Sequence, residues 1–255
     1  MMTRSPLEPL LGGGRLRTSS IEEFPRNLVP VEIPPHTVML RGIAWDSNVY
    51  LVRDGGEALI IDTGTGVNWH VYTGIWEREG YLDGVEKAIV FNTHEHFDHV
   101  GGNRPLGEWL KNRGIEVLFA AHETTAKTLE RGDDYVILAH LYGRKFEPHK
   151  VDLKLKDGDK LRIGSLGLEL IHTPGHTAGS SCLYLDDGEK RIMFTGDTLF
   201  RGTVGRTDLP TGDSEKLKES LERLSEFEVD FGLPGHGRYI DDWRGNLKEI
   251  MGWLL

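Results

Sequence analysis

The hydrophobic and polar positions of this chain follow two periods, which predict strands and helices in turn. From Asn48 to Arg53 apolar and polar residues alternate, and the run Ala58–Ile61 is apolar after the turn Asp54-Gly55-Gly56. This pattern predicts a β-hairpin. Period and apolar runs predict four further elements in the first half: strands over 87–92 and 115–120, and helices over 68–79 and 103–113.

The second half of the chain repeats this arrangement. Segments 151–155 and 160–163 flank the turn Lys156-Asp157-Gly158-Asp159, and the closing helix is expected to bury residues up to Leu254. The other predicted elements are strands over 168–172, 180–185, 190–195 and 229–233, and helices over 213–227 and 241–254. Two β-rich halves, each with helices, predict an α/β fold in which two sheets pack face to face with helices outside.

Composition narrows the class of protein. The formal net charge of −10 argues against a chain that grips nucleic acid backbones or anionic membranes. Cys182 is the single cysteine, so no intrachain disulfide forms, which fits a reducing compartment. No export signal and no apolar run of about 20 residues is visible. We expect a cytoplasmic monomer or homodimer, with a partly flexible tail over 1–30 and a single domain over 31–255.

Four separated pieces of the chain carry side chains that bind metals. The first is a dense His-x-His-x-Asp-His run, and the others are Pro-Gly-His, Gly-Asp and a second Pro-Gly-His. Each piece directly follows a predicted strand, and imidazole and carboxylate ligands suit zinc, iron or manganese. The predicted ligands are His94, His96, Asp98, His99, His176, Asp197 and His236.

The spacing of these ligands indicates two metal positions. His94 and His96 can point to one side of a turned loop, with His176 completing their set. After the turn, Asp98 and His99 can face a second metal that His236 completes, and two carboxylate oxygens let Asp197 bridge the pair. Two metals about 3.5–4 Å apart can activate a shared water. Outside these pieces, His122 is expected to cap a helix or to lie at the surface, and His172 to be packed or hydrogen-bonded.

On these residues the sequence resembles the metallo-β-lactamase superfamily. The order of the predicted ligands matches that of the superfamily, and Asp62 of Ile61-Asp62-Thr63-Gly64 matches the acidic residue that supports the metal-binding loop from behind. The resemblance extends from about Asn48 to Gly237. It implies a four-layer αββα sandwich, with two mixed β-sheets packed face to face and helices outside.

Two further stretches, Gly196-Asp197-Thr198-Leu199-Phe200 and Gly205-Arg206-Thr207-Asp208, resemble the glyoxalase II branch. That branch comprises hydroxyacylglutathione hydrolases, which cleave a glutathione thioester. Full-length members carry a C-terminal helical domain that supplies glutathione-binding residues. Only one helix can follow His236 here, so the chain is more similar to short bacterial members that lack this domain.

The resemblance implies a metal-dependent hydrolase that cleaves a thioester or ester of a small molecule. A metal-bridging hydroxide attacks the carbonyl, with Asp98 and Asp197 as catalytic carboxylates and two divalent ions, zinc foremost, as cofactors. Arg206 and Arg201 are predicted to contact an anionic substrate, although an ion pair between Arg206 and Asp208 is the alternative. Tyr142 is the third predicted substrate contact, and it lies in the stretch 131–150, which is either a lid or pocket wall or a plain surface connection.

Other functions remain open on the motifs alone. Persulfide dioxygenases share much of the same stretch and hold a single iron through the equivalents of His94, His176 and Asp197. A lactonase or β-lactamase is a further alternative. The acidic charge disfavours a nuclease of the superfamily, and the complete ligand set disfavours a non-catalytic binding module.

Overall fold

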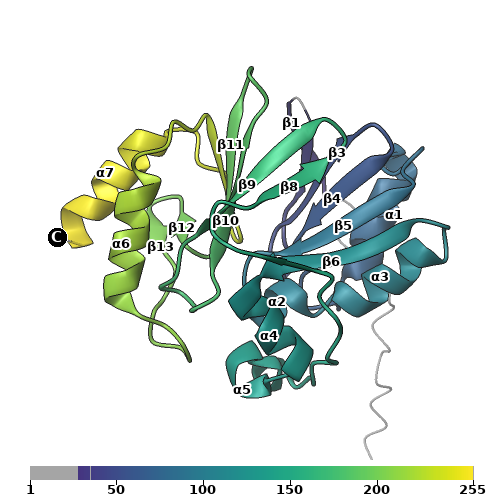
Figure 1. Ribbon diagram of the computed structural model, residues 1–255, viewed down its shortest axis with the longest axis horizontal. Coiled ribbons are helices and arrows are strands. Elements are labelled where there is room, and N and C mark those ends of the chain that lie inside the picture. Colours follow the sequence, from purple (N-terminus) through teal and green to yellow (C-terminus); the bar gives the residue numbers. More distant parts are fainter. Residues whose placement is uncertain (1–27, 35, 255) are drawn as a thin grey trace, which may run out of the picture.

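The computed structural model describes residues 28–34 and 36–254, and two β-sheets dominate this part of the chain (Figure 1). Residues 1–27 of the predicted tail lie outside it, so the domain boundary at residue 30 stays a prediction. The larger sheet has seven strands in sequence order, antiparallel from β1 to β4 and parallel from β4 to β7. They are β1 (Val31–Ile33), β2 (Thr37–Leu40), β3 (Val49–Asp54), β4 (Glu57–Ile61), β5 (Lys87–Asn92), β6 (Glu116–His122) and β7 (Leu153–Leu155).

The second sheet has five strands in the order β14-β11-β10-β9-β8. Its pairs are antiparallel except for β11 and β14, which run parallel. These strands are β8 (Lys160–Ile163), β9 (Leu166–His172), β10 (Ser181–Asp186), β11 (Arg191–Gly196) and β14 (Phe231–Pro234). A short hairpin of β12 (Leu199–Phe200) and β13 (Thr203–Val204) follows β11.

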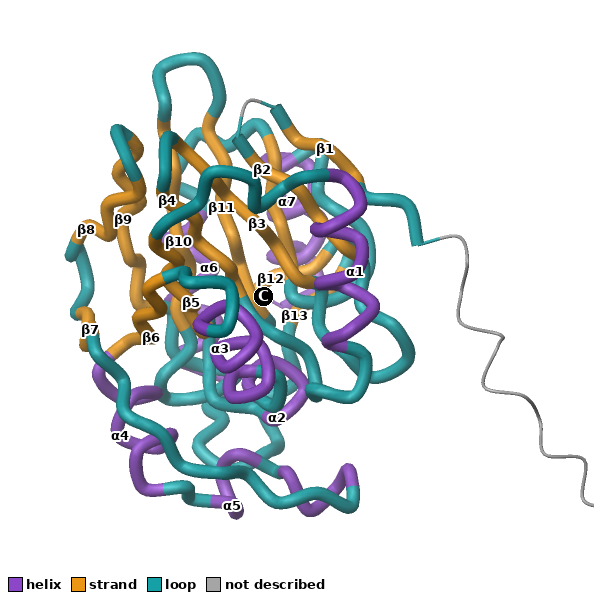
Figure 2. Tube along the Cα trace, turned by 90° about the vertical axis from the view of Figure 1, so that its right-hand side faces the viewer, coloured by secondary structure: helices purple, strands orange, loops and turns teal. Residues whose placement is uncertain are grey.

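Helices cover the outer faces of both sheets, as Figures 1 and 2 show. The larger sheet is covered by α1 and α3, and the smaller one by α6 and α7. A third group, α2, α4, α5 and the 3-10 helix η1, lies at one edge of the sheets. The bounds are α1 (Trp69–Glu79), α2 (Phe97–Val100), α3 (Asn103–Lys111), α4 (Glu123–Arg131), α5 (Asp134–Ile137), η1 (Ala139–Tyr142), α6 (Ser214–Leu224) and α7 (Trp243–Leu254).

The alternation along the strands explains why the sheets stack in layers. In β4, Leu59 and Ile61 face the core between the two sheets, whereas Ala58 and Ile60 face α1 and α3. Successive side chains of a strand point to opposite faces, so a strand with apolar residues at every position is buried on both sides. The resulting order of layers is helix, sheet, sheet, helix, and the predicted αββα sandwich is confirmed.

The sequence pattern leaves one detail open, and the structure differs from it in another. The turn Lys156–Asp159 crosses from one sheet to the other, because β7 pairs with β6 in the larger sheet and β8 pairs with β9 in the smaller one. Local alternation cannot distinguish a hairpin turn from a crossing between sheets. Leu254 is also 37% exposed, because the last turn of α7 extends beyond the buried residues of that helix.

His122 joins the two sheets through a stacked pair of imidazoles. Its ring accepts a hydrogen bond from the Thr124 amide at the start of α4, and it stacks on His172 at 3.9 Å between ring centroids. Nε2 of His172 hydrogen-bonds to the Ala178 carbonyl. Both histidines therefore have the capping and packing roles that their positions predicted.

The His122 ring makes stability depend on pH in a defined direction. Burial, and next the His172 ring, lower its pKa from 6.5 to about 4. Between these two pH values the unfolded chain binds more protons than the folded one. The contribution of His122 to the free energy of unfolding is therefore fully present above pH 6.5 and is lost as the pH falls toward 4. We expect His122→Asn, which keeps a capping acceptor but does not titrate, to remove on the order of 2 kcal/mol of this loss. Urea unfolding of the wild type and the variant at pH 7 and pH 4 measures the loss of stability on acidification. An equal loss in both proteins would contradict the expectation.

Candidate metal centre

The carboxyl ends of strands from both sheets deliver the predicted ligands to one edge. In the larger sheet, β5 leads into His94 and His96, and the short helix α2 that follows carries Asp98 and His99. In the smaller sheet, the segments after β9, β11 and β14 carry His176, Asp197 and His236, in that order. Parallel pairing of β4 with β5 and of β11 with β14 places these ends side by side. The structure brings all seven predicted ligands together.

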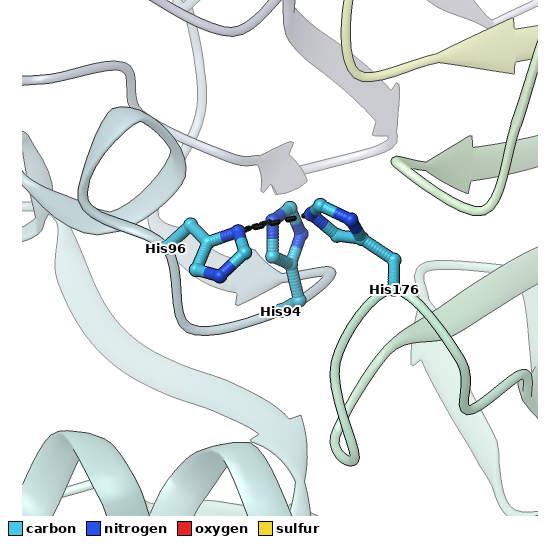
Figure 3. A group of neighbouring side chains, drawn as sticks. All are labelled: His94, His96 and His176. Atoms are coloured by element: carbon cyan, nitrogen blue, oxygen red, sulfur yellow. Dashed lines mark hydrogen bonds between the residues drawn. The ribbon is translucent and has the colours of Figure 1, made fainter. Parts of the chain in front are cut away.

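Three imidazoles form the first group (Figure 3). Nδ1 of His96 lies 3.2 Å from Nε2 of His94 and 2.9 Å from Nε2 of His176. All three rings are buried. Ligands arranged tetrahedrally around a zinc ion, at about 2.0–2.1 Å from it, lie about 3.3 Å from one another. The spacing of these nitrogens is close to that value, so the group fits a metal ion.

Hydrogen bonds behind the rings orient their lone pairs toward the centre. Nδ1 of His176 donates to the Arg206 carbonyl at 2.7 Å, which leaves Nε2 as an acceptor. The Thr93 hydroxyl donates to Asp62 and can accept from Nδ1 of His94 at 3.1 Å. Lone pairs that face each other repel unless a cation lies between them. The partners of these histidines therefore prepare Nε2 for a metal.

The second group consists of Asp98, His99 and His236. Nε2 of His236 lies 3.1 Å from Oδ2 of Asp98 and 3.3 Å from Nε2 of His99, and the latter is 3.8 Å from Oδ2 of Asp98. His99 is fully buried, whereas Asp98 and His236 are partly exposed. This group is therefore the side of the centre that is open to solvent.

Asp197 lies between the two groups. Its Oδ2 is 3.7 Å from Nε2 of His176 in the first group and 3.7 Å from Nε2 of His236 in the second. Its Oδ1 is 3.3 Å from Nε2 of His99, and this buried oxygen accepts no hydrogen bond from the described residues. A carboxylate in this position can contribute an oxygen to each group.

The carboxylates of the centre need positive charge beside them, and without a metal ion that charge comes from protons on the imidazoles. Burial disfavours the charged form of His99, but the carboxylates of Asp197, Asp62 and Asp98 outweigh it and raise the pKa of His99 well above its ordinary value. Burial also opposes ionisation of Asp197, yet His99 and His236 hold its pKa well below the usual range. Protons on imidazoles thus substitute for a cation, and the residues present fit divalent metal ions.

Other rings of the centre stay neutral. Burial, and then the neighbouring histidines, lower the pKa of His94 well below 6.5 and that of His96 to about 3. Neutral imidazole is the form that binds a metal. Nε2 of His96 is buried and has no hydrogen-bond partner among the described residues, so its ring is held by packing.

Asp62 supports the ligands from the end of β4. Its Oδ2 accepts Nδ1–H of His99 at 2.8 Å and the Thr93 hydroxyl at 2.8 Å, while Oδ1 accepts the Thr93 amide at 2.9 Å. Asp62 has a positive φ of 59°, a strained backbone conformation that its three hydrogen bonds with the ligand loop offset. It orients His99 and fixes the start of the ligand loop.

Replacing this carboxylate is expected to weaken metal binding without removing a ligand. We expect Asp62→Asn to lower zinc affinity about 10–100-fold, as loss of such supporting partners does. Competition with a fluorescent chelator measures it. Asp54→Asn is the matched control, because Asp54 accepts hydrogen bonds from Ser165 at the other end of the β3–β4 hairpin. Equal affinity of Asp62→Asn and the wild type would contradict the expectation.

The predicted substrate residues lie in different surroundings. Arg206 is exposed and pairs with Asp208 at 2.6 Å, although its backbone carbonyl holds His176. Arg201 is exposed and pairs with Asp241 at 3.1 Å. Tyr142 is the one of the three whose side chain lies near a predicted ligand, since burial, and next the Asp98 carboxylate, raise the pKa of its hydroxyl.

Two functional positions were not predicted from the sequence. Glu95, buried between two ligands, accepts hydrogen bonds from Thr125 at 2.8 Å and Thr177 at 3.1 Å, which ties the ligand loop to α4 and to the His176 loop. Asn48 donates to the Pro234 carbonyl at 2.9 Å and so holds the His236 loop against the larger sheet. The position of Glu95 between two predicted ligands could have indicated its role. Nothing in the sequence around Asn48 indicates the contact that it makes.

Comparison with known proteins identifies the relatives of this chain. A family model described as the metallo-beta-lactamase superfamily matches residues 42–236. A probable metallo-hydrolase of Methanocaldococcus jannaschii is 35% identical over 206 residues, which cover 79% of this chain and 93% of that protein. Hydroxyacylglutathione hydrolase GloC of Haemophilus influenzae is 30% identical over 221 residues, covering 82% and 91%. Acyl-coenzyme A thioesterase MBLAC2 of Homo sapiens is 30% identical over 217 residues, covering 74% and 72%.

Solved structures share the fold. BLEG-1, a B3 metallo-beta-lactamase, matches with a TM-score of 0.68 and 25% identity, covering 85% of this chain and 96% of its own. TTHA1623 in a di-iron-bound form matches with a TM-score of 0.62 and 27% identity, covering 87% and 96%. Within the described residues, no helix is long and apolar enough to span a membrane.

Proposed function

We propose that this chain, which belongs to the metallo-β-lactamase superfamily, is a two-metal hydrolase that cleaves a thioester or ester of a small molecule. One observation carries the proposal: Asp197 lies between a three-imidazole group and a more exposed group of Asp98, His99 and His236. His94, His96, His176 and Asp197 would hold one ion, and Asp98, His99, His236 and Asp197 the other. Zinc is the foremost candidate, with iron or manganese as alternatives.

The chain's own residues would bind and orient the reactants. When bound, two divalent ions would acidify a shared water and polarise the substrate carbonyl. Asp98 faces the open side of the centre and can accept a hydrogen bond from the attacking water, which aims its lone pair at the carbonyl carbon. The Tyr142 hydroxyl lies near Asp98 and can donate a hydrogen bond to this carboxylate. Asp98 and Asp197 are therefore the catalytic carboxylates in this proposal.

Thioester cleavage is favoured over other reactions by two considerations. Named relatives of this chain include a hydroxyacylglutathione hydrolase and an acyl-coenzyme A thioesterase, each 30% identical. A leaving thiol has a pKa of about 8.5 and departs as thiolate with little protonation. A site built from metal ligands needs no dedicated general acid for this bond.

A dioxygenase with a single iron is the second candidate, because the three ligands that it would need, His94, His176 and Asp197, are all present. TTHA1623, in its di-iron-bound form, is a similar structure that binds iron. Metal analysis of the purified protein, together with S-lactoylglutathione hydrolysis and oxygen uptake on glutathione persulfide, separates the two. About two metals per chain with thioester cleavage would support the hydrolase. One iron per chain with oxygen uptake and no hydrolysis would overturn it in favour of the dioxygenase.

Arg206 and Arg201 are proposed to contact an anionic substrate by exchanging their exposed carboxylate partners. We expect Arg206→Ala to lower kcat/KM for an anionic thioester by up to about 5-fold, because an exposed ion pair contributes at most about 1 kcal/mol. A neutral thioester should be unaffected. Arg238→Ala, another exposed arginine just after His236, serves as the comparison. Equal losses on both substrates would refute the contact.

A further inference from the structure

A large groove lies beside the exposed half of the metal centre. Its volume is about 530 Å³, within the range of small-molecule sites. Three segments form its walls: the loop from Ile43 to Asp46, the loop from Thr65 to Asn68, and the end of η1 from Leu141 to Arg144. Most of its side chains are apolar, which contrasts with the charged metal centre.

The groove lies next to the segment that carries the proposed catalytic carboxylate. Phe97, the residue between His96 and Asp98, lines it. The Phe97 ring lies 5.5 Å from the Tyr142 ring, which also lines the groove. A group bound here would therefore end at the open side of the centre, next to Asp98.

Large apolar side chains on its walls face solvent. Trp45 is 76% exposed, Leu141 64% and Val67 49%. Single exposed hydrophobic residues are common, but three around one concave site, next to a metal centre, indicate a binding surface. Because no other described element covers them, their apolar surface is available to a ligand.

These side chains are held in place rather than loosely exposed. Asp46 is buried and accepts hydrogen bonds from the Thr65 amide at 2.8 Å, Asn68 at 2.9 Å and the Tyr72 hydroxyl at 2.8 Å. This network fastens one wall loop to the other. Ala44 has a positive φ of 57°, a strained conformation for alanine that turns the chain just before Trp45. A prearranged wall lowers the entropy cost of binding.

We propose that this groove binds an apolar acyl group of the substrate and makes the enzyme selective for long acyl chains. The inference rests on the proposed hydrolysis and names the substrate class for it. The acyl end is assigned to the groove because Trp45, Val67 and Leu141 present a neutral, apolar surface, which suits an alkyl chain better than a charged thiol carrier such as glutathione. Arg144 is the one basic side chain among the lining residues. The carbonyl at the end of the chain would then lie beside Asp98.

A series of thioesters of one neutral thiol tests the selectivity. S-acetyl, S-butyryl, S-hexanoyl and S-octanoyl N-acetylcysteamine are assayed with the metal-loaded protein. Each added methylene is expected to raise kcat/KM about 4-fold until the groove is filled, from about 0.8 kcal/mol per buried methylene. Leu141→Asn, which keeps the size of the side chain, should flatten this dependence. Tyr135→Ser is the matched control: Tyr135 is 73% exposed on the same stretch but does not line the groove.

A binding measurement separates failure of this inference from failure of the proposed function. The ketone analogues of these thioesters, with a methylene in place of sulfur, cannot be hydrolysed, and calorimetry gives their Kd. If no thioester is cleaved but the analogues bind more tightly with length, and Leu141→Asn removes the trend, the groove assignment stands and the reaction is wrong. If thioesters are cleaved with no dependence on length, or if Tyr135→Ser changes the trend as much as Leu141→Asn, the groove assignment is overturned.

Discussion

Replacing Asp197 with asparagine is expected to lower kcat/KM for thioester hydrolysis by roughly 10³-fold, the scale for loss of a preorganised electrostatic group in a buried site. The physical reason is charge as well as geometry. Asp197 is the carboxylate that faces both groups, at 3.7 Å from His176 and from His236. Asparagine keeps the shape but offers one neutral oxygen, so it cannot offset positive charge on both sides.

The same substitution should also reduce the metal content, measured by plasma emission spectrometry on the purified protein. Asp83→Asn is the matched control, because Asp83 is exposed in the turn after α1 and carries the same chemical change. Circular dichroism establishes that both variants fold. An Asp197→Asn protein that is folded, retains its metal and hydrolyses at the wild-type rate would show that the bridging role is wrong.

Removing the metals is expected to abolish hydrolysis and to lower the melting temperature. Ions that bind only the folded state stabilise it by about 2.7 kcal/mol each when free metal exceeds Kd 100-fold. For a chain of this size that is roughly 5–10 °C per ion. The ligands themselves give the reason: without ions, the inward nitrogens of His94, His96 and His176 face one another at 2.9–3.2 Å.

Differential scanning calorimetry before and after treatment with a chelator measures this effect. Readdition of zinc should restore both the melting temperature and the activity, and the same chelator presaturated with zinc controls for effects other than metal removal. A melting temperature that stays unchanged while metal analysis shows complete removal would mean that the ligand cluster is stable by packing alone. That outcome would contradict the destabilising repulsion inferred from the geometry.

Features that depend on neighbouring residues in the chain could be predicted from the sequence, and features that depend on distant residues could not. The boundaries of β5 at Lys87 and Asn92 agree with the predicted strand, because an apolar run is a property of neighbouring residues. The fold class was likewise predicted, since two β-rich halves with helices have few ways to bury their apolar faces. The change of sheet between β7 and β8 was not, because no local pattern distinguishes it from a hairpin.

The sequence by itself determined the chemical identity of the centre, since imidazoles and carboxylates at such spacing have few uses other than metal binding. Only the tertiary structure decided how these ligands are held. The Arg206 carbonyl behind His176 and the carboxylate of Glu95 beneath the ligand loop act through partners 30 or more residues away. The groove beside Asp98 was likewise decided by the tertiary structure, because Trp45, Val67 and Leu141 come from three loops. Their proximity depends on how the elements pack, which short-range patterns do not encode.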